Sequence, residues 1–366
     1  MSKDPLKYHS KILLITDLYP IDNSDNSIPY AIENIALGLK EFGYKVTIFR
    51  PNFLINTILR NHKTYKEGIY QRNGIKIYNK NFILPFVFNN FKTDEKFDLI
   101  ISHMPSGNLY ADLINKQLKL PHISIVHNSD YKVLSDLKYS IYFKNRLKKA
   151  LENSSLVGAR NCSLKKFLKT DFILPSFIEN KYIIKKKTSQ EKLKIITISR
   201  LIKRKNIDMV INALSKLNCD FEYDIYGDGK ERKKLEKLIK KYKLNDKVII
   251  HGAIEHNLIW EKLDKADIFI LPSKDETFGL CYLEAMARGL ITIAKKNESM
   301  DNIIKNNKTG FLVKNSNDIK DVLEKLNTKN KQSLIENTLD NIKNYTKEKI
   351  IENYSQIIQS AKFTNC

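Results

Sequence analysis

The chain has 366 residues, more than one hydrophobic core usually supports, so the sequence predicts two domains. Apolar residues make up 42% of the chain, which excludes disorder as its main state. The formal net charge is +22, but the basic residues form no arginine-rich tail and no nucleic-acid module, so no nucleic-acid partner is expected. An anionic membrane surface or a phosphorylated substrate would explain the charge, and so would composition alone, because lysine, asparagine and isoleucine are abundant throughout.

Targeting and metal signals are absent from the sequence. No apolar run is long enough to span a bilayer, and the polar N-terminus has no signal-peptide core behind it. We therefore expect a cytoplasmic protein, with peripheral attachment to the inner face of the membrane as an option. Its cysteines, Cys162, Cys219, Cys281 and Cys366, are scattered without a Cys-x-x-Cys pair, so neither a disulfide framework nor a metal site is predicted.

The first half of the chain alternates short apolar runs with helix-length intervals. Residues 11–17 predict a buried parallel strand, residues 30–42 a helix that ends before Gly43, and residues 46–49 the next strand. Further strands are expected at 97–101, 122–126 and 155–157. This alternation predicts a doubly wound α/β sheet.

Residues 139–151 combine apolar and basic side chains at helical spacing. The apolar members are Ile141, Tyr142, Leu147 and Leu151, and the basic ones are Lys144, Arg146, Lys148 and Lys149. The pattern is typical of an ordinary surface helix, and membrane contact is the lesser alternative.

The pattern changes after residue 178, where the chain becomes lysine-rich and turn-prone. We predict an N-terminal domain over 1–178, a linker over 179–192, a second domain over 193–345, and a C-terminal helix over 346–366 that packs back towards the first domain. A second, similar sheet is predicted from strands at 194–198, 221–225, 248–250, 268–271 and 291–293, with helices at 207–217 and 230–242. The segment 333–362 also has a helical pattern.

Two loops of the second domain suggest a diphosphate site. The loop after strand 194–198 carries Arg200 and Lys205, which we expect to be exposed; a guanidinium grips two pyrophosphate oxygens and an ammonium adds a compact charge. The loop after strand 221–225 carries Gly227 and Gly229, at the sheet edge where ligands of open α/β sheets bind. Taken alone, the loop of Arg200 and Lys205 is also explained by chance in a lysine-rich chain, and the loop of Gly227 and Gly229 is also explained as a tight turn.

The most specific motif is Glu276-Thr-Phe278-Gly279-Leu280-Cys-Tyr-Leu-Glu284, which begins in the loop after strand 268–271. Gly279 falls near the start of a helix, whose free amides are suited to phosphate oxygens. Helical side chains lean towards the N-terminus, so Glu284 reaches back to the same place. This order fits a ligand whose sugar hydroxyls contact Glu276, whose phosphate contacts Gly279 and whose ribose contacts Glu284. The structural alternative is that two glutamates simply flank an amphipathic helix.

His127 is the candidate site residue of the first domain. It follows strand 122–126, so it lies at a carboxyl end, from which a side chain reaches a ligand at the sheet edge. A neutral structural histidine is the usual alternative. His103 has a similar place after strand 97–101, with a weaker argument for a role.

These residues together resemble the glycosyltransferase family 4 superfamily. That family carries an arginine–lysine pair, a glycine turn and two glutamates separated by seven residues, as Arg200, Lys205 and the motif from Glu276 to Glu284 do here. The likeness is specific over about 194–313 and only general before that. It implies the GT-B fold, two Rossmann-like doubly wound domains facing each other across a cleft.

The resemblance also implies an activity: retaining transfer of a sugar from a nucleotide donor, UDP-hexose or UDP-N-acetylhexosamine, to a saccharide acceptor, lipid-linked in surface polysaccharide or glycoconjugate synthesis. No cofactor and no obligatory metal are implied. Arg200 and Lys205 would bind the diphosphate, Glu276 the donor sugar and Glu284 the ribose, with His127 placing the sugar near the reacting carbon. Phe278, Gly279 and Leu280, with Gly227 and Gly229, complete the expected donor site.

Two segments depart from the family pattern. Residues 20–29 lack the glycine-rich loop of many relatives, and residues 295–301 lack a glycine pair. A non-catalytic GT-B protein that stabilises another transferase, and a nucleotide-sugar epimerase of the same fold, are the rival functions. Neither the sugar, the acceptor nor the linkage follows from the sequence.

Overall fold

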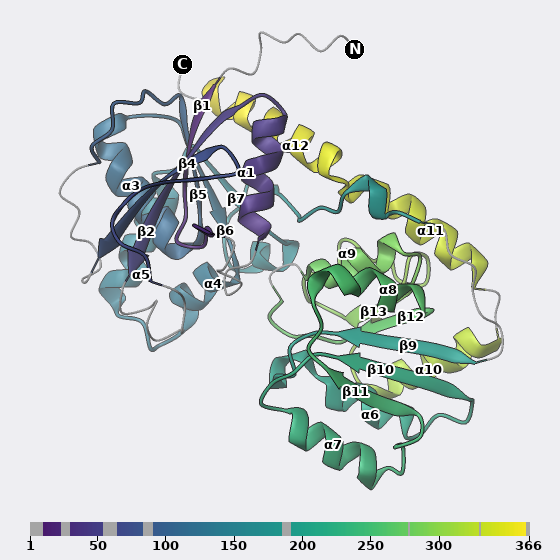
Figure 1. Ribbon diagram of the computed structural model, residues 1–366. Helices are drawn as coiled ribbons and strands as arrows, with labels where there is room; N and C mark the ends of the chain where they lie inside the picture. The colour runs from purple at the N-terminus through teal and green to yellow at the C-terminus, as the bar shows by residue number, and fades with distance from the viewer. Residues whose placement is uncertain are drawn as a thin grey trace. The chain divides into compact units, whose positions relative to one another are not determined.

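A computed structural model describes residues 10–22, 30–53, 64–82, 91–184, 192–276, 279–328 and 331–363. The chain divides into two compact units, the first made of Met1–Pro175 with Ile350–Cys366 and the second of Ser176–Lys349. Each unit contains one largely parallel sheet covered by helices (Figure 1). The α/β architecture with two sheets in tandem is therefore confirmed.

The first unit holds an eight-stranded sheet in the order β3-β4-β2-β1-β5-β6-β7-β8. Its strands are β1 (Lys11–Ile15), β2 (Lys45–Phe53), β3 (Gly68–Arg72), β4 (Ile75–Phe82), β5 (Leu99–His103), β6 (His122–Val126), β7 (Leu156–Ala159) and β8 (Phe172–Ile173). The central strand β1 pairs in parallel with β2 and β5. Because helices cover both faces, such strands consist of nearly continuous apolar residues.

The edge of this sheet is a hairpin that the sequence pattern did not predict. β3 runs antiparallel to β4, and the turn between them has positive φ at both Asn73 (51°) and Gly74 (68°). That geometry suits the right-handed twist of paired strands, and Asn-Gly is its strongest sequence signal. The dipeptide was therefore the clue that would have revealed the hairpin.

Helices of the first unit include one from the far end of the chain. They are α1 (Ala31–Glu41), α3 (Met104–Leu118), α4 (Asn128–Ser135), α5 (Ile141–Glu152) and most of α12 (Lys347–Phe363). Tyr44, just after α1, shares a 2.7 Å hydrogen bond with Ser355 of α12, and both residues are buried. The last helix is thus part of the first unit's core.

The second unit holds a six-stranded sheet in the order β11-β10-β9-β12-β13-β14. Its strands are β9 (Leu193–Ile198), β10 (Phe221–Tyr226), β11 (Val248–Gly252), β12 (Ile268–Leu271), β13 (Ile291–Lys295) and β14 (Phe311–Val313). Its helices are α6 (Ile207–Leu214), α7 (Arg232–Lys241), α8 (Ile259–Asp264), α9 (Leu280–Ala287), α10 (Ser316–Thr328) and α11 (Gln332–Ile342). Adjacent strand pairs are parallel.

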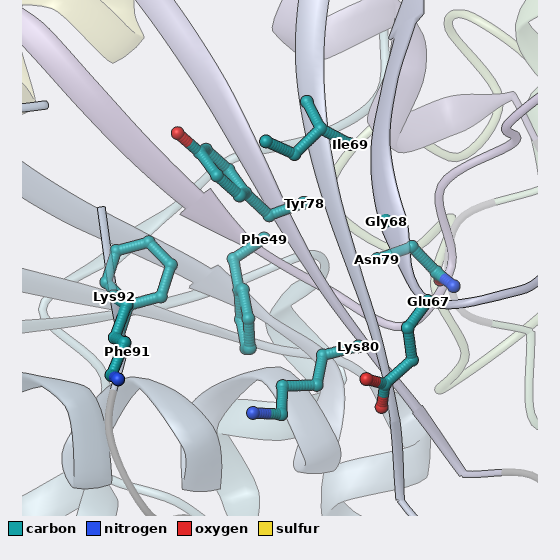
Figure 2. A pocket seen from close by; sticks show the side chains of 9 residues that line it. All are labelled: Phe49, Glu67, Gly68, Ile69, Tyr78, Asn79, Lys80, Phe91 and Lys92. Atoms are coloured by element: carbon teal, nitrogen blue, oxygen red, sulfur yellow. The ribbon is translucent and has the colours of Figure 1, made fainter. Parts of the chain in front are cut away.

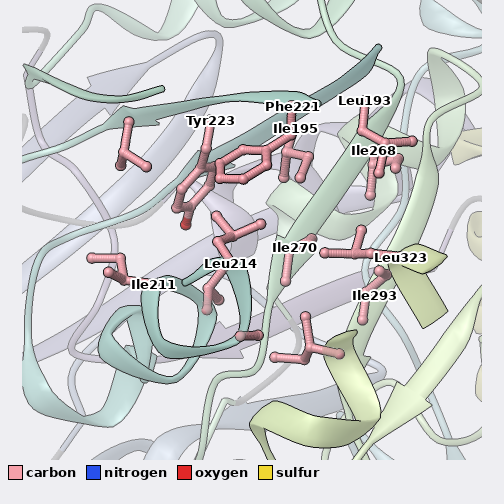
Figure 3. Packing of buried hydrophobic residues seen from close by; sticks show 14 of the residues in the cluster. Leu193, Ile195, Ile211, Leu214, Phe221, Tyr223, Ile268, Ile270, Ile293 and Leu323 are labelled. Atoms are coloured by element: carbon pink, nitrogen blue, oxygen red, sulfur yellow. The ribbon is translucent and has the colours of Figure 1, made fainter. Parts of the chain in front are cut away.

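Alternate residues of these strands pack against helices on opposite faces of the sheet. Ile195 and Ile270 join Leu214 of α6 in one buried cluster, which Figure 3 shows from close by. Phe269, on the other side, packs with Leu283 of α9. Because both faces are buried, the loops at the strand ends are held on a rigid frame.

The segment 333–362 is interrupted where a continuous helical pattern was predicted. A 3-10 turn over Lys343–Tyr345 follows α11, and Thr346 then becomes extended (φ −75°, ψ 157°) and pairs with Ile178 before α12 begins. Residues 179–184, placed in the predicted linker, lie in the second unit, where the Ile184 amide donates to the Ala287 carbonyl over 2.9 Å. No helix among the described residues is long and apolar enough to cross a membrane.

Candidate functional site

Three loops of the second unit each follow one of three neighbouring strands, so they lie along one edge of the sheet. They follow β9, β10 and β12, which are adjacent in the order β10-β9-β12. Ligands of open α/β sheets bind along the carboxyl ends of the strands. The loops carry the arginine–lysine pair, the glycine turn and Glu276, so the topology places all three motifs at the same edge.

Gly227 and Gly229 are needed for contact between two backbones. A Cβ at Gly227 would lie 1.8 Å from the carbonyl oxygen of Ser199, and one at Gly229 would lie 2.4 Å from that of Leu201. In this close packing the Leu201 amide donates to the Asp228 carbonyl over 2.8 Å. The two glycines therefore let the β10 loop support the loop of Arg200, which is a structural reason for them apart from any ligand.

Arg200 and Lys205 differ in exposure although they share a loop. Arg200 is exposed, and no hydrogen bond or ion pair of its guanidinium is found among the residues that the structure describes. Lys205 ends a 3-10 turn, Lys203–Lys205, and is only 7% exposed. The expectation that both side chains are exposed is thus wrong for Lys205, because its ammonium turns inward to a carboxylate.

That carboxylate belongs to Glu276. The Lys205 ammonium pairs with Glu276 Oε2, to which Ser273 Oγ donates over 3.1 Å and which lies 3.4 Å from Arg204 Nη1. Burial raises the pKa of Glu276, but Lys205 and Arg204 outweigh it and hold the pKa below its usual value. The motif glutamate is therefore an ionised, largely buried acceptor whose charge two cations balance.

The start of α9 follows directly, and its first turn depends on a glycine. Gly279 has φ 71°, and a Cβ there would lie 2.6 Å from the ring of Tyr282. Leu280 is the first residue of the helix, as the motif predicted. Phe278 lies outside the described residues. The N-terminus of α9 follows the loop of Glu276 in the chain, and backbone amides at a helix N-terminus stabilise an anion.

Glu284 is buried in the second turn of α9, with its side chain 7% exposed. Its Oε1 lies 3.1 Å from Nε2 of His256, a largely exposed residue in the short turn that follows β11. The hydrogen bond that the His256 ring donates to Glu284 raises the pKa of His256. His256 was not singled out by sequence; its place after a strand of this sheet was the only signal.

Both motif glutamates affect the thiol of Cys281, the second residue of α9. Burial raises the pKa of its thiol to about 12, the positive charge of Lys205 opposes this, and Glu276 and Glu284 add to it. The charges of Lys205, Glu276 and Glu284 thus all influence this thiol of α9. The structure thus gathers Lys205, Glu276 and Glu284 around the first turns of α9.

His127 of the first unit lies next to His103. Both are buried, and Nδ1 of His103 is 3.2 Å from Nε2 of His127. Burial, with Arg160 nearby, lowers the pKa of His103 to about 3; burial, His103 and Arg160 also hold that of His127 well below its usual value. Both rings are neutral, a state consistent with a sugar ligand and with a structural histidine alike.

Asp130 fixes the backbone at His127. Its Oδ2 accepts from the His127 amide and its Oδ1 from Asn108 Nδ2, both over 2.8 Å. Burial raises the pKa of this carboxyl to about 7, although both hydrogen bonds oppose the rise. The hydroxyl of Ser102, which lies 2.8 Å from Nε2 of His122, donates to Asn108 over 2.7 Å. No sequence pattern indicated this network, because its members come from separate strands and helices.

A cavity of about 550 Å³ opens elsewhere in the first unit, along β2, β3 and β4. Figure 2 shows Phe49, Tyr78 and Phe91 beside Lys80 and Glu67 at this cavity. It contains none of the sequence-predicted site residues. We therefore assign the candidate site to the loop edge of the second unit.

The match to a known family covers this unit. Residues 179–349 match the family model described as glycosyl transferases group 1. We refer to this matched stretch as the group 1 domain. The group 1 domain contains the loops of Arg200, Lys205 and Glu276, so the motifs and the family match point to the same part of the chain.

Similar proteins span the rest of the chain as well. An uncharacterized glycosyltransferase of Methanocaldococcus jannaschii is 27% identical over 361 residues, covering 93% of this chain and 95% of that protein. A putative colanic acid biosynthesis glycosyltransferase of Salmonella typhimurium is 27% identical over 173 residues, 45% of this chain and 42% of that protein. A protein that matches nearly the whole chain and one that matches part of it are thus both named as glycosyltransferases.

Similar solved structures cover nearly the whole chain and identify its fold. Sucrose-phosphate synthase from Thermosynechococcus elongatus has a TM-score of 0.74 at 16% identity, covering 96% of this chain and 99% of that one. The HepE protein of Anabaena, solved with UDP and glucose, has a TM-score of 0.70 at 16% identity, covering 96% and 100%. The fold is GT-B, as the resemblance implied.

Proposed function

We propose that this protein is a retaining glycosyltransferase that moves a sugar from a UDP-hexose or UDP-N-acetylhexosamine donor to a saccharide acceptor. The observation that carries the proposal is the cluster of Lys205, Glu276 and Glu284 around the start of α9, within the group 1 domain. The complex of the HepE protein with UDP and glucose supports this choice of donor.

We assign a role to each site residue from the chemistry of its side chain. Arg200, exposed at the loop edge, and Lys205 bind the diphosphate, because cations stabilise the charge that develops on the leaving group. Glu276 accepts from hydroxyls of the donor sugar, and Glu284 from the ribose. His127, neutral in the first unit, positions the sugar. We propose that fixed cations and helix amides make a metal unnecessary.

The acceptor is proposed to be a lipid-linked saccharide in polysaccharide or glycoconjugate synthesis, reached by a cytoplasmic protein that docks on the inner face of the membrane. One surface of the first unit supports this. Leu137, Ile141 and Tyr142 are 94%, 76% and 61% exposed, and Lys138 and Lys148 beside them are also exposed. Exposed apolar side chains in a segment that also carries exposed cations are suited to an anionic lipid surface.

The decisive experiment begins with a thermal-shift screen of nucleotide sugars. A ligand at a hundred times its Kd stabilises the native state by about 2.7 kcal/mol, which raises the melting temperature by several degrees. The stabilising donor is then incubated with a lipid-linked saccharide extract, with and without EDTA, and the anomeric configuration of the product is read from its proton coupling. We expect transfer with retention in both buffers.

The rival functions give different results in the same assay. An epimerase would convert the donor without any acceptor, and a non-catalytic stabilising subunit would neither transfer nor bind. Inversion at the anomeric carbon, or activity abolished by EDTA, would overturn the corresponding part of the proposal.

A further inference from the structure

A turn without glycine follows β13 next to the loop of Glu276. Asn297 has φ 66°, and its amide lies 2.8 Å from each carboxylate oxygen of Asp301. Ser299 and Met300 are buried at 3% and 1% exposure and anchor the turn. Glu298 therefore extends from a fixed piece of backbone.

The carboxylate of Glu298 binds the residue just before Glu276. Its Oε2 accepts from the Asp275 amide over 3.0 Å. β12 and β13 are parallel neighbours, so the loops that follow them lie side by side. Burial raises the pKa of Glu298 although the Asp275 amide opposes the rise, which agrees with a half-buried contact.

Asp275 needs such support because its φ is 52°, in the left-handed region that non-glycine residues seldom adopt. A conformation of this kind persists when surrounding contacts fix it. Arg204 provides some of them, because its carbonyl accepts from the Lys274 amide over 2.7 Å and its Nη1 donates to the Asp275 carbonyl over 3.2 Å. These contacts come from the β9 side of the loop, and Glu298 holds the loop from the β13 side.

We propose that Glu298 is a positioning residue that clamps the loop of Glu276 and so sets where this carboxylate meets the donor sugar. The inference rests on the proposed function for the sugar-facing role of Glu276. The clamp itself is a property of the unliganded protein.

Three variants separate the clamp from general effects on folding. Glu298→Ala removes the acceptor, Glu298→Gln keeps an oxygen that accepts from the same amide, and Lys296→Ala alters an exposed side chain of the same turn. Hydrogen exchange of a peptide spanning residues 271–276 is measured first. We expect exchange at least tenfold faster in Glu298→Ala, with Glu298→Gln and Lys296→Ala close to the unaltered protein.

Calorimetry and kinetics then test the positioning role. In Glu298→Ala the affinity for the nucleotide sugar and kcat/KM fall about tenfold while UDP binds as before, and Glu298→Gln recovers most of the loss. Unchanged exchange in Glu298→Ala would overturn the clamp. Faster exchange with unaltered sugar binding, or an equal loss of UDP and nucleotide-sugar affinity, would overturn the positioning role.

If the unaltered protein binds the nucleotide sugar but transfers nothing, the transferase proposal fails and the binding comparison still decides the role of Glu298. If it binds no nucleotide sugar, both fail.

Discussion

Lys205 and Arg200 show how two cations of one loop come to have different environments. The Lys205 ammonium and the Glu276 carboxylate are 9% and 14% exposed, so they form a largely buried pair, whereas Arg200 is in solvent. Removing one member of a buried pair leaves a charge that water reaches poorly. The two residues therefore differ in their contribution to stability.

We expect Arg200→Ala to lower kcat/KM about a hundredfold, the equivalent of roughly 3 kcal/mol in the transition state, without changing the melting temperature. Lys205→Ala should lower activity as well and also reduce the free energy of unfolding by about 2 kcal/mol. Urea unfolding and initial rates measure both quantities. In the double variant Lys205→Ala/Glu276→Gln part of the stability should return; a further loss would contradict the buried-pair interpretation.

His256 makes nucleotide binding depend on pH if Glu284 binds the ribose. The pKa of His256 is raised above 6.5 by Glu284, so the protonated ring holds the carboxylate at low pH and releases it as pH rises through that raised pKa. Removing the ring should free Glu284 at every pH. The nucleotide affinities of the unaltered protein and of a variant without this ring should therefore differ only at acidic pH.

The measurement is UDP affinity by calorimetry at pH 6.0 and 8.5 for the unaltered protein and for His256→Asn. At pH 6.0 we expect the variant to bind about threefold more tightly, a size typical of a partly exposed ion pair, and at pH 8.5 the two should agree. Comparison at equal pH removes the titration of UDP itself. An equal offset at both pH values would mean that His256 acts in another way.

At the scale of elements, α5 and the turn before it carry the apolar surface of the first unit. Tyr139 is also exposed, at 41%, so four of the six residues 137–142 present large apolar side chains to solvent. Leu147 and Leu151 point into the unit and are buried. The predicted amphipathic helix is confirmed, with its inner face in the core and its N-terminal end exposed.

Sedimentation with vesicles tests whether this surface docks on lipid. Binding should require anionic lipid and weaken with salt, because each near-surface Lys or Arg contributes about 1 kcal/mol that is screened. A variant with Lys144, Arg146, Lys148 and Lys149 changed to glutamine should lose most of the binding. A second variant, Ile141→Ser with Tyr142→Ser, should bind more weakly but keep its salt dependence. Equal binding by all three proteins would place the contact elsewhere.

Over the whole molecule, buried histidines determine the response of stability to acid. The pKa of His103 is about 3 and that of His122 about 4, both lowered mainly by burial, and His127 is lowered too. Below about pH 6.5 the unfolded chain takes up protons that the native state does not, so these groups lower stability as pH falls. Asp130, raised to about 7, acts in the opposite direction.

With His103, His122 and His127 opposing Asp130 and, more weakly, His256, we expect the free energy of unfolding to fall by roughly 2 kcal/mol per pH unit between pH 6.5 and 5. Urea unfolding followed by circular dichroism at several pH values measures the slope. Asp130→Asn should make the slope steeper because it removes an opposing group. A slope of zero, or a shallower slope in that variant, would contradict the buried neutral histidines.

The sequence by itself determined most of the parallel strands and the loops of the candidate site. Residues 122–126 and 268–271 were predicted as strands and coincide with β6 and β12, because an apolar run flanked by polar residues encodes a strand buried on both faces. The start of α9 after Gly279 followed in the same way from local pattern. Such patterns encode only local structure. They predict where a strand or helix lies in the sequence but not which other elements it packs against.

Only the tertiary structure decided which side chains meet. Lys205 and Glu276 are 71 positions apart and come together because β9 and β12 are adjacent strands; His256 reaches Glu284 across 28 positions, and Tyr44 reaches Ser355 across 311. The order of parallel strands is set by how crossover helices pack on the sheet, which no run of consecutive residues records. The burial of Lys205 and the clamp of Glu298 depend on that order, and so were visible only in the folded chain.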